Sequence, residues 1–307
     1  MIGLLAGLDI GGTKTHIRTE HSDGSTVDVV VPSAGWSASP ITDAAQWIGN
    51  CIEDNVREPI AALGVGAQGC NTQPQCRALS AALTQRLGVP VEVTNDAALL
   101  VPAAGITDGI GVIAGTGAIA VGVLPGGDLA FCGGWGWVLG DEGSAPALVR
   151  EATRRALADH DAGRDADPLL SLLATGFGVT GAERLARAVN DTPTTESWGA
   201  RAGIVFQAAD RGSESAISVI VAAGAALAAL VATLAAKGVP AEHVVIAGSV
   251  AVNQPRLLDA FRAALQRAVP TAAVRVLTEP PVAGAIALAR RYGMTTDLMN
   301  PAGRSAK

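Results

Sequence analysis

Apolar and polar positions alternate in short runs through the first third of the chain. Leu4–Asp9 is a mainly apolar run that leads into a Gly-rich turn, and Thr15–Thr19 and Thr26–Val31 follow as runs joined by the turn Ser22–Ser25. Runs of this length bounded by turn residues are typical of β-strands. The elements predicted to follow are a helix at 41–56, a strand at 62–66, a helix at 77–87 and a strand at 89–94. This alternation of strands and helices indicates an α/β fold.

A second cycle of the same kind begins near residue 111. Gly111–Ala114 is predicted as a strand, Ala118–Leu124 as the next strand, and Leu129–Cys132 as a third. Residues 146–236 are mainly helical in pattern. The remaining predicted elements are a strand at 243–247, a helix at 255–269, a strand at 274–277 and a helix at 282–292.

Two segments of the chain resemble each other. Residues 7–15 and 112–120 both show a strand, a Gly-rich turn and a second strand, about 100 residues apart. Solenoid repeats have periods of roughly 20–50 residues, so the pattern indicates a duplicated unit and two similar halves facing a cleft. The chain has 37 glycines, and two Gly-rich hairpins also arise by chance in such a chain.

Composition bounds the number of domains and the class of partner. The chain has 307 residues, of which 49% are hydrophobic and 16% charged, which is typical of a globular protein. The length favours two domains over one. The net charge is −6 and no basic run is present, which argues against a nucleic-acid-binding surface.

The cysteines are predicted to be reduced, buried thiols. None of the four is in C-x-x-C spacing, and no histidine clusters with them, which disfavours a zinc site or a disulfide framework. The cysteines are Cys51, Cys70, Cys76 and Cys132.

Two apolar segments resemble targeting or membrane segments. Residues 1–9 lack a basic region and are too short for a secretion signal, so we expect a first strand there. Residues 216–236 carry no charge, but they are rich in Ala, Gly and Val and have no flanking aromatic belt. We expect a core helix, no membrane partner and a cytoplasmic location.

The turn that follows the first strand is the first candidate phosphate site. Its glycine pair would let backbone N–H groups approach phosphate oxygens, and its hydroxyl and ammonium groups would add donors. Asp9, at the strand end, could hold Mg²⁺ through water molecules. An ordinary hairpin turn is the alternative. The candidate phosphate-binding residues of this turn are Gly11, Gly12, Thr13, Lys14 and Thr15.

Two later turns have similar chemistry. Gly115, Thr116 and Gly117 form a turn of the same type, which could clamp a phosphate chain from the opposite wall. Gly248 and Ser249 follow the strand at 243–247, and such small residues suit a turn that lies flat against a planar group such as adenine. Each of these turns is a weak signal when taken alone.

Asn95 and Asp96 follow the predicted strand at 89–94. A carboxylate there lies at the carboxyl end of a strand, where open α/β sheets bind their ligands. Asn and Asp are also favoured at helix N-caps, so a purely structural role for the pair stays open.

The segment Cys132–Ser144 combines glycines, tryptophans and carboxylates in a way that disfavours regular structure. Such a loop could press the indole of Trp135 and the carboxylates of Asp141 and Glu142 against a polar ring ligand. The alternative places Trp137 with its two apolar neighbours in the core and makes Asp141 the cap of the following helix.

In this order, the motifs resemble the actin-like ATPase superfamily, which includes sugar kinases and actin. The resemblance runs from about Leu4 to Leu288 and is closest to the branch of N-acetylglucosamine kinases and BadF/BadG/BcrA/BcrD ATPases. Its most specific part is Gly133–Ser144, which resembles the signature of that branch. The implied fold is a duplicated ribonuclease-H-like α/β unit, with a nucleotide between two lobes. The implied domains are 1–103 with the helix 282–295, and 104–281.

The resemblance also implies roles for the motifs. Asp9–Thr15 and Gly115–Gly117 correspond to the two phosphate loops, Gly248 and Ser249 to the adenosine loop, and Asp96 to the catalytic base. ATP and Mg²⁺ are the implied cofactors, and the 6-hydroxyl of an amino sugar is the implied acceptor. The candidate sugar-binding residues are Ser37, Asn95, Asp96, Gly134, Trp135, Asp141 and Glu142.

Some positions depart from the family pattern. N-acetylglucosamine kinases of this branch often carry an Asn in the loop after the third strand, whereas Ser33–Pro40 has none. Glucosamine or another hexose is therefore as compatible as N-acetylglucosamine. Ser249 stands where a second glycine is commoner, and the cysteine cluster of the ROK kinases is missing.

Three functions remain after this comparison. The first is an ATP-dependent sugar kinase, the second an ATPase that activates a radical dehydratase, and the third a non-catalytic sugar sensor. An activator would share an iron–sulfur cluster across a dimer, and the cysteine positions do not indicate one. Asp9 and Asp96 together argue against a sensor. A homodimer is expected from related kinases alone.

Overall fold

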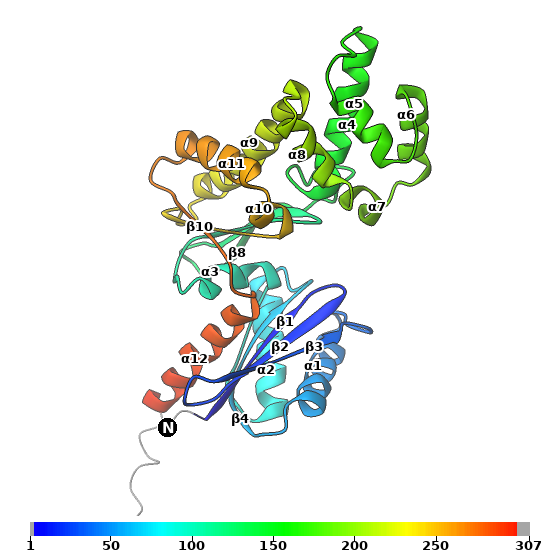
Figure 1. Cartoon of the computed structure of the whole chain (residues 1–307). Helices are drawn as coiled ribbons and strands as arrows, with labels where there is room; N and C mark the ends of the chain where they lie inside the picture. Colours follow the sequence, from blue (N-terminus) through cyan, green and yellow to red (C-terminus); the bar gives the residue numbers. More distant parts are fainter. Residues whose placement is uncertain (1–2, 300–307) are drawn as a thin grey trace, which may run out of the picture. The chain divides into compact units, whose positions relative to one another are not determined.

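The computed structural model describes residues 3–299, with side chains up to Arg291. The chain forms two compact units (Figure 1). Unit 1 comprises the described parts of Met1–Gly111, Gly122–Leu129 and Leu277–Lys307. Unit 2 comprises Val112–Val121 and Ala130–Val276.

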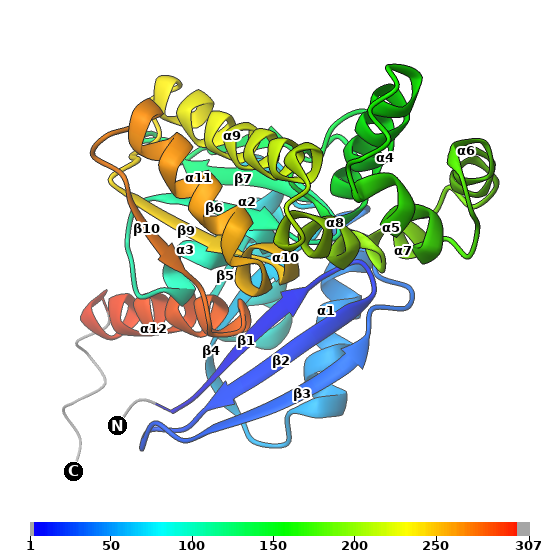
Figure 2. The ribbon, with the colours of Figure 1, turned by 45° about the horizontal axis from the view of Figure 1, so that its top comes forward.

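Unit 1 is built on a five-stranded sheet in the order β3-β2-β1-β4-β5. Its strands are β1 Leu4–Ile10, β2 Lys14–Glu20, β3 Thr26–Pro32, β4 Ile60–Ala67 and β5 Val91–Thr94. Strands β1, β2 and β3 form an antiparallel meander (Figure 2), whereas β4 is parallel to β1 and β5 is parallel to β4. The carboxyl ends of β1, β4 and β5 therefore meet at one edge of the sheet.

The two faces of this sheet are covered by different helices. The helices of unit 1 are α1 Ile41–Asn55, α2 Gln73–Leu87, the 3₁₀ turn η1 Asp96–Leu99, α3 Leu100–Ala103 and α12 Val282–Met299. Leu8 and Ile10 of β1 join a core with α1 and α2, whereas Leu5 packs with Ile286 of α12. Successive strand side chains point to opposite faces, so one strand serves both cores.

Helix α12 lies directly against the backbone of the sheet. A Cβ atom on Gly64 of β4 would lie 1.9 Å from the carbonyl oxygen of Ala285, so only glycine permits this approach. Helix α12 thereby packs against β1 and β4, the first and fourth strands (Figure 2).

Unit 2 contains the second sheet, in the order β10-β9-β6-β7-β8. Its strands are β6 Ile110–Ala114, β7 Ala118–Val123, β8 Leu129–Gly133, β9 His243–Ala247 and β10 Ala273–Val276. Read from its other edge, this order is β8-β7-β6-β9-β10. When the strands of each sheet are counted in chain order, both sheets therefore have the order third, second, first, fourth, fifth. The predicted α/β fold with a duplicated unit is confirmed.

The helices of unit 2 are gathered in the middle of its sequence. They are α4 Ala145–Asp161, α5 Leu169–Gly176, α6 Ala182–Asp191, α7 Thr195–Gly199, α8 Ala202–Asp210, α9 Glu214–Ala236, α10 Ser249–Asn253 and α11 Pro255–Ala268. Helix α9 is long and apolar enough to cross a membrane, and 39% of its apolar window is buried. It packs against α11, which lies beside it in Figure 2, and against α4 and α8. These contacts are those expected of a helix in a domain core.

Most predicted elements agree with the structure to within two residues at each end. Two helices are exceptions. Helix α2 begins at Gln73, four residues before the predicted start, and α12 ends at Met299, seven residues after the predicted end. Thr72 caps α2 by accepting a hydrogen bond from the backbone N–H of Gln75, and Pro74 occupies its first turn. Helix α10 was predicted as a turn, and it starts at Ser249 itself.

Candidate active site

Asp9 and Asp96 lie at the edge of the unit 1 sheet where parallel strands end. Asp9 is the penultimate residue of β1 and is paired across the sheet with Gly66 of β4, which is in turn paired with Thr94 of β5. Asp96 follows two residues later. The pKa of Asp9 is raised to about 7, mainly by burial and also by the nearby charge of Asp96, while Lys14 opposes the shift. The two carboxyl groups are therefore close enough to influence each other's ionisation.

The helix cap beside this pair is made by Asn95 and leaves the Asp96 carboxyl group for other contacts. Asn95 is buried, and its side-chain oxygen accepts a hydrogen bond of 2.9 Å from the backbone N–H of Ala97, at the start of η1. Burial raises the pKa of Asp96, and hydrogen bonding to the backbone of Ala97 lowers it by a smaller amount. Asp96 is thus a partly desolvated carboxyl group that η1 does not need as its cap.

The turn after β1 presents three residues to solvent. The backbone N–H of Gly11 donates to the carbonyl oxygen of Lys14 over 3.1 Å, which closes the turn, and Gly12, Thr13 and Lys14 are exposed. Thr15 differs from them, because it is fully buried and its hydroxyl lies 2.8 Å from that of Ser33. The structure therefore places three of the five candidate phosphate-binding residues, Gly11–Thr13, in the turn, and Lys14 and Thr15 at the start of β2.

The donor chemistry of this edge fits a magnesium ion held with few protein ligands. Among residues 3–299, no group of three or more His, Cys, Asp or Glu side chains is placed to hold a metal. Asp9 and Asp96 offer carboxylate oxygens, and their mutual repulsion would be relieved by a cation. Mg²⁺ prefers oxygen ligands and retains several waters, so two carboxylates beside a phosphate turn suit it.

The loop after β3, Ser33–Pro40, is tied to the sheet by indole hydrogen bonds. Trp36 donates from Nε1 to the carbonyl oxygen of Gln68 over 3.1 Å, and Trp47 of α1 donates to that of Ala34 over 3.1 Å. Ser37, a candidate sugar-binding residue, is exposed, and its hydroxyl donates to the carbonyl oxygen of Ser39 within the same loop.

The loop after β4, residues 68–72, is the part of this edge that sequence analysis missed. Its Gln68 side chain lies beside the turn after β1, because a Cβ atom on Gly12 would be 2.8 Å from Gln68 Oε1. Its Asn71 accepts a hydrogen bond of 3.0 Å from the amide of Asn95. A polar run directly after an apolar, parallel-type strand was the signal that could have identified these residues.

In unit 2, the two small-residue turns lie next to each other. The backbone N–H of Gly115 donates to Gly117, and a Cβ atom on Gly115 would lie 3.5 Å from the backbone nitrogen of Ser249. Gly248 has a φ of 101°, and a Cβ atom there would lie 2.4 Å from the carbonyl oxygen of Ala114. Both constraints require glycine at 248, so the ends of β6 and β9 form one small-residue surface.

Asp141 is buried beside the same turn. A Cβ atom on Gly117 would lie 3.2 Å from Asp141 Oδ2, and the backbone N–H of Gly136 donates to Asp141 Oδ1 over 3.3 Å. Burial raises the pKa of Asp141. The prediction that Asp141 caps α4 is wrong, because Ser144 makes that cap by accepting from the backbone N–H of Ala147.

The rest of the Cys132–Ser144 segment is mainly exposed. Gly134 and Glu142 are exposed, and the exposed fraction of Trp135 is 77%. Trp137 packs edge to face on Trp198, with ring centres 4.7 Å apart. The alternative that put the apolar neighbours of Trp137 in the core is wrong, because Val138 and Leu139 are also exposed.

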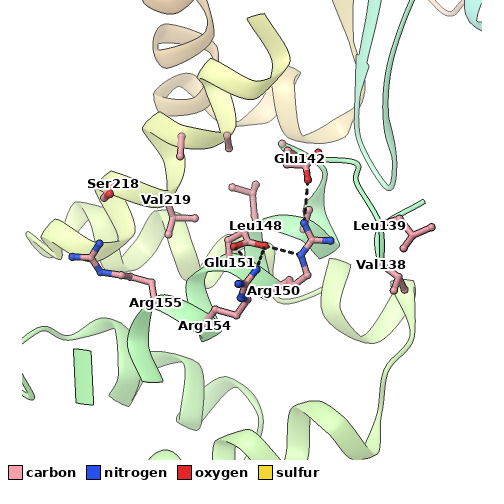
Figure 3. Close-up of a pocket in the computed structure, with 14 residues that line it drawn as sticks. Val138, Leu139, Glu142, Leu148, Arg150, Glu151, Arg154, Arg155, Ser218 and Val219 are labelled. Carbon is pink, nitrogen blue, oxygen red and sulfur yellow. Dashed lines mark hydrogen bonds and ion pairs between the residues drawn. The ribbon is translucent and has the colours of Figure 1, made fainter. Parts of the chain in front are cut away.

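A groove of about 710 Å³ lies on another part of unit 2, between α4, α9 and the segment 138–143. Figure 3 shows Arg150 held between Glu142 and Glu151, with 3.6 Å and 2.7 Å between the closest charged atoms. The side chains that line the groove are mainly paired ions and apolar groups, and none of the candidate phosphate-binding residues is among them. Glu142 is the one candidate sugar-binding residue that lines the groove. The candidate nucleotide-binding and catalytic residues form two sets elsewhere, around Asp9 and Asp96 in unit 1 and around Gly115–Gly117 in unit 2.

Comparison with known proteins shows which family the chain belongs to. The sequence model of the BadF/BadG/BcrA/BcrD ATPase family matches residues 6–288. An N-acetylmuramic acid/N-acetylglucosamine kinase of Clostridium acetobutylicum is 28% identical over 170 residues, 50% of this chain and 54% of that protein. An N-acetyl-D-glucosamine kinase of Dictyostelium discoideum is 26% identical over 245 residues, 73% of this chain and 76% of that protein.

The fold is shared with a protein of known structure. A crystal structure of a protein provisionally named N-acetylglucosamine kinase, from Chromobacterium violaceum, has a TM-score of 0.63 and 24% identity, covering 94% of this chain and 99% of that one. The match to the Clostridium kinase spans only about half of that relative's length. The family match confirms the resemblance inferred from the motifs, and the matched family is one of ATPases.

Proposed function

We propose that this chain, which belongs to the BadF/BadG/BcrA/BcrD ATPase family, uses ATP to phosphorylate a small sugar. The two curated relatives are named as kinases of N-acetylglucosamine, one of them also of N-acetylmuramic acid. We propose an amino sugar, N-acetylglucosamine or glucosamine, as the acceptor and its 6-hydroxyl as the attacking group.

The observation that carries this proposal is the carboxyl pair of Asp9 and Asp96 beside an exposed glycine turn. A sugar hydroxyl is a poor nucleophile near neutral pH, and a positioned carboxylate accelerates its attack by accepting the proton. Asp96 suits this role because Asn95 makes the cap of η1 and leaves the Asp96 carboxyl group available. The proton of the 6-hydroxyl would pass to Asp96 as the oxygen attacks the terminal phosphorus of ATP, and the bond from that phosphorus to the bridging oxygen would break to release ADP.

The remaining residues would bind and neutralise the phosphates. The backbone of half-buried Gly11 and exposed Gly12, the hydroxyl of Thr13 and the ammonium group of Lys14 would contact phosphate oxygens. Asp9 would hold Mg²⁺ through water molecules, and the ion would supply charge neutralisation of the transferring phosphate. Phosphoryl transfer depends mainly on positioning and on such electrostatic stabilisation.

Unit 2 carries the other candidate nucleotide-binding residues. We assign Gly115–Gly117 to a phosphate and the neighbouring Gly248 and Ser249 to adenosine, because these small residues form one surface. The exposed indole of Trp135 is assigned to the sugar, and the buried Asp141 to the phosphate or metal side, because it lies beside Gly117.

A panel of sugars with ATP and Mg²⁺ tests the proposal. ADP release is measured by a coupled assay for N-acetylglucosamine, glucosamine, N-acetylmuramic acid, N-acetylmannosamine and glucose, and phosphorus NMR of the product locates the phosphate. We expect sugar-dependent ADP release and a 6-phosphate for one amino sugar. ADP release that no sugar stimulates, together with iron bound after anaerobic purification, would favour a dehydratase activator instead.

A further inference from the structure

Three side-chain amides connect the loop after β3 to the residue pair Asn95–Asp96. The amide nitrogen of Gln75 donates to the carbonyl oxygen of Ala38 over 3.3 Å, and the oxygen of the same amide accepts from the backbone N–H of Asn71 over 3.2 Å. The side chain of Asn71 then accepts from Asn95 Nδ2 over 3.0 Å. The chain of contacts therefore runs from Ala38 through Gln75 and Asn71 to Asn95.

The hydrogen bonds of Asn95 and Gln75 fix the orientation of their side-chain amides. Asn95 uses its oxygen to accept from the backbone N–H of Ala97, so its nitrogen must face Asn71. Gln75 likewise uses its oxygen toward Asn71 and its nitrogen toward Ala38, so its amide has only one productive orientation. The linkage is thus directional and depends on an amide at position 75.

Gln75 is anchored well enough to act as a fixed point. It lies half-buried in the first turn of α2, and its backbone N–H donates to the capping hydroxyl of Thr72. The following Cys76 and Leu79 are buried in the core under the sheet. The loop 33–40 has no helix or strand of its own, so its position depends on contacts of this kind.

We propose that Gln75 is a positioning residue that sets the loop 33–40 relative to Asp96 and thereby governs how well the sugar acceptor is oriented. This role rests on the proposed function, since it assumes that the loop 33–40 contacts the sugar and that Asp96 accepts its proton. Gln75 acts through Ala38 and Asn71. Its loss therefore affects the sugar more than ATP, whose candidate contacts are at Gly11–Lys14.

The test compares Gln75→Ala with Gln85→Ala, a change of the same residue type at an exposed position of the same helix. Two hydrogen bonds are lost in Gln75→Ala, and we expect kcat/KM for the sugar to fall about 10-fold or more, with the ATP KM changed less than about 2-fold. Gln85→Ala should match wild type in both. Parallel changes in sugar and ATP kinetics that track the melting temperature would overturn the proposal.

Gln75→Glu separates the two halves of the linkage. Glutamate can still accept from the backbone N–H of Asn71, but it cannot donate to the carbonyl oxygen of Ala38. We expect hydrogen exchange of the loop 33–40 to rise several-fold in Gln75→Glu, with exchange near Asn71 unchanged. In Gln75→Ala both regions should exchange faster, and in Gln85→Ala neither.

Hydrogen exchange also distinguishes failure of this inference from failure of the proposed function. If wild type phosphorylates no sugar of the panel, the proposed function fails, and the role of Gln75 toward the sugar fails with it. If wild type is an active sugar kinase while both Gln75 variants retain its sugar KM and its exchange in the loop 33–40, only the positioning role is refuted.

Discussion

Replacement of Asp96 by asparagine tests the proposed chemistry most directly. Asn and Asp have nearly the same size, so the substitution removes a proton acceptor and a negative charge without removing volume. The cap of η1 is made by Asn95 and is unaffected. We therefore expect Asp96→Asn, and Asp96→Ala as well, to fold normally.

The expected loss of turnover follows from the value of a general base. A positioned carboxylate contributes about 10²–10⁴-fold, which corresponds to about 2.7–5.4 kcal/mol of transition-state stabilisation. The kcat of Asp96→Asn should fall by at least about 10²-fold, while the ATP Kd changes little. Steady-state kinetics and calorimetry measure the two quantities.

The same variant should alter the dependence of stability on pH. The pKa of Asp9 is about 7 in the folded protein, well above the ordinary value for an aspartate. The folded state therefore holds this proton more tightly than the unfolded state, and stability falls as pH rises from about 4 through 7. Removing the charge of Asp96 should make this fall smaller, as measured by melting in EDTA.

Wild-type turnover in Asp96→Asn would refute the role of Asp96 as base, and Asp141 would be tested next.

Three further changes are expected to have separate effects. Gly12→Val adds a branched side chain where even a Cβ atom would lie 2.8 Å from Gln68 Oε1. Calorimetry should therefore show an ATP Kd at least about 10-fold higher in a folded protein. Unchanged affinity would show that the turn does not bind ATP. Trp135→Ala removes a side chain that is 77% exposed, so the melting temperature should hold while the sugar KM rises more than the ATP KM; equal shifts would contradict sugar contact. Hydrogen bonds from Ser215 first, and then from Arg164 and Arg155, lower the pKa of Asp159 to about 2. Asp159→Asn should therefore reduce the melting temperature at pH 7, and the difference from wild type should vanish as pH falls through about 2.

The sheet of each unit could be predicted from local pattern because its strands are short apolar runs bounded by turns. Leu4–Asp9 and 243–247 were identified in this way. The alternative that placed Val138 and Leu139 in the core rested on their apolar side chains alone. It failed because a Gly-rich loop can hold large side chains in solvent, and hydrophobic periodicity does not indicate burial in such a loop. The predicted start of α2 was four residues too late, although Thr72 and Pro74 are recognisable signals for the start of a helix.

The candidate site was predictable only where a motif is continuous in sequence. The turn after β1 and Asn95–Asp96 could be identified because glycines or carboxylates follow a strand. Their proximity depends on the parallel order of β1, β4 and β5, which local pattern does not determine. Gln75 could not be identified, because a glutamine in the first turn of a helix has no distinguishing signal until its partners Ala38 and Asn71 are known.

The packing of α12 on the unit 1 sheet has a consequence for synthesis on the ribosome. Residues 130–276 of unit 2 form one continuous stretch, whereas unit 1 is completed only by the segment that begins at Leu277. The face of β1 that carries Leu5 stays uncovered until Ile286 and its neighbours have been made. Strand β1 is therefore translated long before the helix that covers it, and an early stop before α12 would leave an apolar sheet face for chaperones or for aggregation.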